Sequence, residues 1–181
     1  MTIIDLWLPV AAATLVMFAA SAVIWTVFKW HNADYRRLAD EAGARAGLTG
    51  NPPGFYLLPY CVDPKELEQA EVRQKYEQGP IGYITMLPNG VPPMGAKMVT
   101  MFVYFLVVSI LCAYVVSRTL HADADYLAVF RVAGTVTFIA NSFALVPESI
   151  WFGRPWRMTA RNFLDALIYS LLAGGVFGWL V

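Results

Sequence analysis

Long runs without a charged residue are the feature that most constrains this chain. Residues 6–28, 98–117, 132–147 and 166–181 contain no Asp, Glu, Lys or Arg. A helix needs about 20 mostly apolar residues to cross the hydrocarbon core of a bilayer, with about 17 as the lower limit. The first two runs meet this length alone. The other two meet it when Arg131 and Asp165 lie inside or at the edge of a helix.

The sequence therefore predicts an all-α membrane protein with four transmembrane helices. A soluble helical protein would need a polar face at helical spacing on each run, and none is visible. Charged residues make up 14% of the chain, whereas soluble domains carry about 25%. We expect residues 1–181 to form a single membrane domain, with a small irregular and α-helical insertion at 30–96 and helices near 6–29, 97–118, 125–147 and 161–181.

Basic residues are distributed unevenly between the two sides that four spans define. One side receives eleven Lys and Arg, and the other receives only Arg118. Cytoplasmic loops are enriched in Lys and Arg near the helix ends. We therefore expect the first and third loops to be cytoplasmic and both termini to face outward. The eleven residues are Lys29, Arg36, Arg37, Arg45, Lys65, Arg73, Lys75, Lys97, Arg154, Arg157 and Arg161.

The insertion holds eight of the eleven prolines and several turn signals. We expect the first helix to continue through "KWHNADYRRLADEAGARAG" to Gly47, and "NPPG" to end it. "DPKE" predicts a helix start capped by Asp63, with its end at Gly79. The extended pieces "GFYLLPYCV" and "GYITMLPNG" are candidates for a small sheet. We expect this segment to lie against the bundle and the inner leaflet, as a binding platform for a partner or as a solvated connector.

Four stretches carry a family resemblance: "FYLLPYCVDP", "YLAVFRVAGT", "SIWFGRPW" and "DALIYSLLAGGVFGWL". Together they resemble an uncharacterised group of small four-span bacterial inner-membrane proteins, over most of the chain from residue 54 onward. The resemblance implies a multi-pass protein of the Gram-negative plasma membrane, with N- and C-termini in the periplasm. It supplies no reaction, cofactor or catalytic residue.

Three charged residues are candidates for an intramembrane role: Arg131, Asp5 and Asp165. Arg131 either snorkels to the headgroups or faces the bundle and pairs with a carboxylate. Its candidate partners are Asp5, Asp123, Asp125 and the Val181 carboxylate. Asp165 lies one turn inside the last helix, where we expect it to pair with Arg161 four residues earlier. A proton relay would need a chain of ionisable groups across the membrane.

Basic and aromatic residues gather around the third loop. They either set the topology or hold an anionic lipid headgroup at the start of the last helix. The residues of this candidate headgroup site are Trp151, Arg154, Trp156, Arg157 and Arg161.

Small residues recur at spacing four in the second and fourth predicted helices. Such residues let helix backbones approach closely in membranes. We expect the two sets to mediate packing, with each other or between subunits. They are Ser109, Ala113 and Ser117 in one helix and Ser170, Gly174 and Gly178 in the other.

No catalytic, nucleotide-binding or metal motif is visible, and we expect no cofactor. His31 and His121 fall on opposite sides, so they predict no heme ligand pair and no metal site. The zero net charge does not suggest nucleic acid as a partner. The function we favour is a non-enzymatic accessory, assembly or interaction subunit, in contact with the bilayer and with protein partners or a second copy. A small oligomeric transporter or channel is the alternative, and a membrane enzyme comes third.

Overall fold

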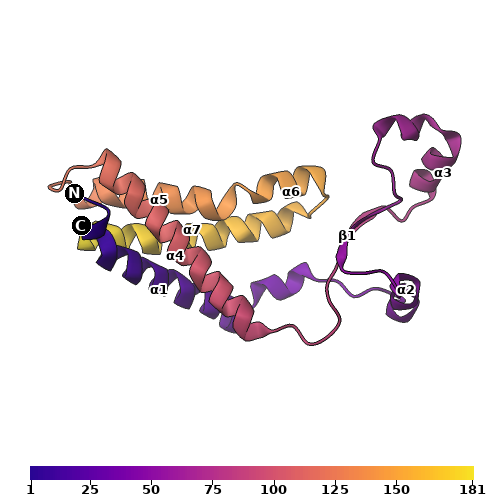
Figure 1. Cartoon of the computed structure of the whole chain (residues 1–181), viewed down its shortest axis with the longest axis horizontal. Helices are drawn as coiled ribbons and strands as arrows, with labels where there is room; N and C mark the ends of the chain where they lie inside the picture. The colour runs from indigo at the N-terminus through magenta and orange to yellow at the C-terminus, as the bar shows by residue number, and fades with distance from the viewer. The chain divides into compact units, whose positions relative to one another are not determined.

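The computed structural model describes all residues from 1 to 181 and is mostly helical, as predicted. Four helices are long and apolar enough to cross a membrane (Figure 1). This confirms a multi-pass membrane protein with the spans Ile4–Phe28, Met94–Thr119, Tyr126–Trp151 and Trp156–Leu180. The chain divides into two compact units. We call them the bundle (Met1–Tyr35, Pro93–Ile150 and Arg154–Val181) and the insertion unit (Arg36–Pro92 with Trp151–Gly153).

The bundle places its four spans around one apolar core. Helix α7 packs along α5 and against α1, while α4 packs against both α1 and α5. The core includes Met17, Phe105, Cys112 and Phe177, all with fully buried side chains. Its elements are η1 Ile4–Leu6, α1 Trp7–Val23, the π-helix η2 Ile24–Phe28, the 3-10 helix η3 Trp30–Asp34, α4 Met94–Thr119, α5 Tyr126–Ser142, α6 Leu145–Trp151 and α7 Trp156–Leu180.

The third and fourth spans differ from their predicted limits near the loop that joins them. Helix α5 ends at Ser142, and α6 continues the span from Leu145. Pro147 accounts for this break, since it has no N–H to donate to the carbonyl of residue 143. Helix α7 begins at Trp156 rather than near 161, directly after Pro155.

The small residues of α7 lie against α5. A Cβ added at Gly174 would come within 2.9 Å of the Phe130 carbonyl oxygen. One added at Gly178 would meet the Tyr126 ring at 2.8 Å. The α4 set has different neighbours: Ser109 accepts a hydrogen bond of 3.1 Å from Thr14 of α1, and Ala113 is fully buried. Within one chain, Gly174 and Gly178 thus lie against α5, and Ser109 contacts α1.

The first helix does not continue to Gly47, so this prediction was wrong. It changes into the π-helix η2 and stops at Lys29, which has a left-handed backbone conformation (φ 53°). Residues 30–34 then form η3, and the separate helix α2 spans Glu41–Leu48. The amide of Lys29 donates to the Ile24 carbonyl across the π-type turn. This turn redirects the chain so that the side chains of η3 reach α7.

The insertion unit contains the predicted hairpin. Strands β1 Gly54–Leu58 and β2 Gly82–Met86 pair antiparallel, with Tyr56 opposite Ile84. Between them lie the 3-10 helix η4 Pro64–Glu68 and α3 Ala70–Gln78. Asp63 caps η4 by accepting from the Lys65 amide at 3.0 Å, and α3 ends at Gly79 with positive φ. Both predicted limits of this helical segment are confirmed.

No residue of the insertion unit is buried. It contains an aromatic trio, in which Phe152 contacts Phe55 and Tyr83 edge-on with ring centroids 5.9 and 5.2 Å apart. Phe55 and Tyr83 also stack on each other at 5.5 Å. The unit therefore has ordered secondary structure without a core of its own.

Candidate functional site

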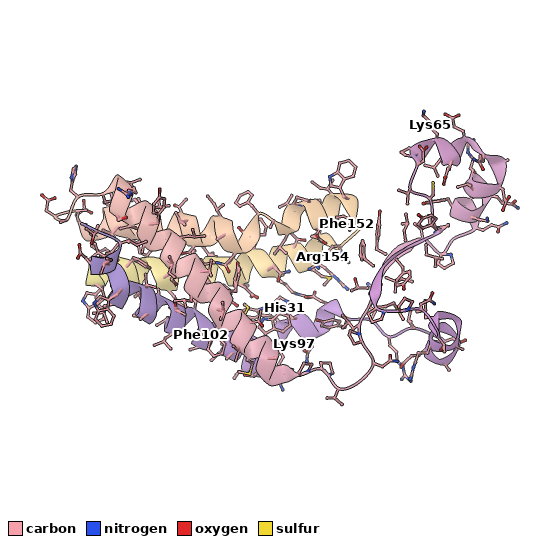
Figure 2. All side chains as sticks on the ribbon, viewed as in Figure 1. His31, Lys65, Lys97, Phe102, Phe152 and Arg154 are labelled. Atoms are coloured by element: carbon pink, nitrogen blue, oxygen red, sulfur yellow. The ribbon has the colours of Figure 1, made fainter.

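A buried polar cluster joins η3 to α7 where the first span ends and the last begins. His31, which Figure 2 labels, contacts both carboxylates of the cluster. The Nε2 atom of His31 lies 2.8 Å from Asp165 Oδ2, and Nδ1 lies 3.0 Å from Asp34 Oδ2. Both carboxylates have a second partner. Trp30 Nε1 donates to Asp165 at 3.1 Å, and Arg161 donates to Asp34 and forms an ion pair with it.

The cluster is withdrawn from solvent. The side chains of His31 and Asp34 are 3% exposed, and that of Asp165 is 7% exposed. The indole of Trp25 covers the imidazole, stacked at 4.3 Å with an angle of 9° between the planes. Every buried side-chain nitrogen and oxygen has a hydrogen-bond partner. Buried charged groups are stable only when paired in this way.

The positions of the two ring nitrogens determine how many protons the cluster holds. A neutral imidazole has one N–H and one lone pair, so it can donate to only one carboxylate. Either the ring is protonated and donates to both, or one carboxyl carries the proton. In both cases His31, Asp34 and Asp165 together hold one proton more than a neutral imidazole and two carboxylates would hold. With the positive charge of Arg161, the four side chains sum to zero.

Asp34 is the carboxyl of the cluster that lies outside the spans. Burial raises its pKa, but the hydrogen bonds from His31 and Arg161 and their charges outweigh this effect. The net result is a pKa below the ordinary value of an aspartate. Asp34 is therefore the ionised partner that balances Arg161.

Of the three charged residues predicted for the membrane, Asp165 alone belongs to this cluster. The expected Arg161–Asp165 pair is not formed, because Arg161 pairs with Asp34 and Asp165 binds His31 and Trp30. Arg131 is exposed on α5 and forms no ion pair. Asp5 accepts a hydrogen bond of 2.7 Å from the Thr2 amide. The structure thus brings none of the candidate partners onto Arg131.

The candidate headgroup residues of the third loop have different environments. Trp151, Trp156 and Arg157 are exposed, and Arg154 is half-buried. Arg161 is bound to Asp34 and belongs to the polar cluster instead. A headgroup site formed by the remaining residues stays a prediction.

Sequence reasoning missed His31, Asp34 and Trp30. A first helix that continues to Gly47 predicts no contact between these residues and the last span. One signal was present: His31 and Asp165 both fall at the membrane end occupied by the first loop.

The donor atoms of the cluster do not surround a common point. His31 lies between the two carboxylates, so its two nitrogens face in different directions toward Asp34 and Asp165. No group of three or more His, Cys, Asp or Glu side chains is arranged to hold a metal ion. The chemistry available here is the binding and transfer of a proton, with Arg161 as charge balance.

No protein-family model matches the chain, and no curated protein or solved structure proved similar to it. The resemblance to four-span inner-membrane proteins therefore stays a prediction beyond the four spans themselves.

Proposed function

We propose that this multi-pass membrane protein is a non-enzymatic accessory, assembly or interaction subunit. In this proposal the bundle is the membrane anchor and the insertion unit contacts a protein partner. The supporting observation is that the insertion unit buries no residue although it forms strands and helices. Exposed apolar side chains of this kind mark interaction sites when they gather on a surface. Within residues 36–92 the most exposed are Tyr60, Val62, Leu87 and Val91.

The charge of the insertion unit favours a protein over an anionic membrane surface as the partner. Residues 36–92 contain six basic and seven acidic side chains. Segments that associate with an anionic membrane surface typically carry clusters of about four to eight Lys or Arg. A balanced mixture of charges beside exposed aromatic and aliphatic groups suits a protein surface better.

A photo-crosslinking amino acid at Tyr60 or Val91, in living cells, tests this proposal. We expect one adduct of discrete mass from both positions. The matched control is position 179, because Trp179 is equally exposed but lies at the end of α7. Adducts of equal yield at position 179, or none at Tyr60 and Val91, would contradict the proposal. An adduct of twice the chain mass would make the partner a second copy.

We also propose a bacterial inner-membrane location, with the insertion unit in the cytoplasm and both termini in the periplasm. The supporting observation is the count of eleven basic residues against one. Cys61 reports on this orientation, since Cys112 is fully buried and gives little background. Burial and the charge of Glu66 raise the pKa of Cys61, so labelling requires a mildly alkaline buffer. A membrane-impermeant maleimide should label Cys61 after lysis only. Labelling of Cys61 in intact spheroplasts would indicate the opposite orientation, with the insertion unit outside the cell.

A proton-coupled transporter, working as an oligomer, is the second candidate. The polar cluster favours it, because ionisable side chains within a membrane bundle commonly lie on ion or proton pathways. His31→Gln keeps hydrogen-bonding groups but cannot carry the proton. If the protein moves protons, purified wild type in liposomes should dissipate a pH gradient and His31→Gln should not. Equal rates for both proteins would remove this candidate.

A further inference from the structure

A groove of about 540 Å³ lies between the end of the first span and the start of α4. One wall carries Phe18, Trp25 and the small residues Ser21 and Ala22. The facing wall carries three methionines and one lysine: Met94, Lys97, Met98 and Met101. Small residues opposite long flexible ones leave this space open. Its volume falls within the range of about 300–1,000 Å³ that is typical of ligand pockets.

Every residue that lines the groove belongs to a membrane span. The first wall is part of Ile4–Phe28, and the second is part of Met94–Thr119. The space therefore opens toward the lipid phase near the end of both helices. Methionine side chains adapt to irregular apolar ligands because they are unbranched and polarisable. A flexible hydrocarbon chain suits such a lining.

The lining of the groove includes a single positive charge. Lys97 is the lining residue with a charge, and it forms no ion pair. It lies in the first turn of α4, where no acidic residue and no side-chain cap satisfies the free amides. The N-terminus of a helix carries a partial positive charge and favours anions. The groove thus combines an apolar channel with an unpaired cationic side chain.

We infer that this groove binds one anionic phospholipid, with an acyl chain between the two walls and the phosphate at Lys97. The positive charge of Lys97 favours an anionic headgroup, and the apolar walls favour the acyl chain of the lipid. The groove also adjoins the polar cluster, since Trp25 lines it and stacks on His31. A bound lipid would therefore contact the residue that covers the buried imidazole. This inference does not depend on the proposed protein partner.

Fluorescence quenching by brominated lipid tests the inference directly. Wild type and Trp25→Phe are placed in nanodiscs that contain a small fraction of brominated lipid, either phosphatidylglycerol or phosphatidylcholine. The difference between the two proteins isolates the signal of Trp25. One basic side chain near a membrane surface contributes about 1 kcal/mol, so we expect about fivefold enrichment of the anionic lipid at Trp25.

Two further variants make the outcome specific. Lys97→Gln should abolish the preference for phosphatidylglycerol, while Lys97→Arg should keep it. Trp179 serves as the reference for ordinary lipid contact, because it is exposed near the C-terminal end of α7 and does not line the groove. Circular dichroism and the thermal transition check that each variant is folded.

Two results would overturn the inference. If quenching of Trp25 follows the bulk lipid composition in wild type and Lys97→Gln alike, the groove holds only ordinary surrounding lipid. If neither brominated lipid quenches Trp25, a protein segment covers the groove instead.

Discussion

The side-chain hydrogen bonds of the bundle and of the insertion unit differ in the sequence separation of the residues that they join. In the bundle, side-chain bonds join residues as far apart in sequence as His31 and Asp165, or Thr14 and Ser109. In the insertion unit, they join residues two to four positions apart, except for the bond from Tyr76 to the Pro59 carbonyl. The bundle therefore requires all four spans together, whereas the insertion unit is a series of local motifs closed by one hairpin.

The two units differ in how their polar groups obtain hydrogen-bond partners. Within a membrane, no water is available to pair a buried donor or acceptor, so the bundle must pair them internally. The insertion unit has no such constraint, and its backbone and side chains stay hydrated. Loss of one partner should thus have a large effect in the bundle and a small one in the insertion unit.

Asp165→Ala should produce the largest effect. The substitution leaves His31 Nε2 and Trp30 Nε1 without their partner and upsets the charge balance with Arg161. Removing one partner of a buried pair costs about 3–5 kcal/mol. We expect a loss of this size in the free energy of unfolding, measured by denaturant titration in detergent. Asp123→Ala, at an exposed position, is the control and should change it by less than about 0.5 kcal/mol. Equal effects would mean that the cluster adds no stability.

Gly174→Leu should have the next largest effect. The new side chain would collide with the Phe130 carbonyl and with the backbone of Gly134. Overpacking of this kind costs about 1–3 kcal/mol, seen as a lower thermal transition in detergent. Gly95→Ala is the matched control, since no atom lies within 4 Å of its added Cβ. If Gly174→Leu is silent, close packing of α5 on α7 is incidental.

Acidification should weaken the bundle through Asp34. Because its pKa in the folded protein is below the ordinary value, the ionised carboxylate contributes stability at neutral pH. This contribution is complete above the ordinary aspartate pKa of about 3.9 and is lost as the pH falls below it. The difference in thermal stability between wild type and Asp34→Asn should therefore be largest near neutral pH and shrink below about pH 4. A difference that is constant across this range would contradict the assignment.

Phe152→Ala tests the insertion unit. It removes two edge-on contacts, with Phe55 and with Tyr83, and each such aromatic pair contributes about 0.5–1.5 kcal/mol. We expect faster hydrogen exchange in β1 and β2 and no shift of the bundle's thermal transition. A shift of that transition would show that the two units unfold together.

Arg131 should be the least sensitive position. It is exposed on α5 and has no ion pair, so its charge can reach the headgroups by snorkelling. We expect both Arg131→Lys and Arg131→Leu to accumulate in the membrane like wild type, with changes below about 0.5 kcal/mol. If Arg131→Lys fails to accumulate in the membrane while Arg131→Leu accumulates normally, the guanidinium has a partner outside this chain.

The sequence predicts much of the fold because hydropathy acts over whole helices. Charge-free runs located all four spans, and turn residues located the hairpin and the cap at Asp63. The site was not predictable in the same way. Its formation depends on Lys29 in a left-handed conformation, for which lysine carries no signal. It also depends on a contact between residues 31 and 165, which local periodicity cannot reveal.

The distance along the chain between His31 and Asp165 has a consequence for biosynthesis. At about 5–20 residues per second, the ribosome adds Asp165 roughly ten seconds after His31. During that interval the first span and Asp34 have been made, but Asp165, the second partner of the His31 imidazole, has not. A chain that stops before α7 keeps His31 and Trp30 without the Asp165 acceptor at the membrane boundary. In such a chain His31 has only Asp34 as a partner, so the cluster is complete only when α7 has been made.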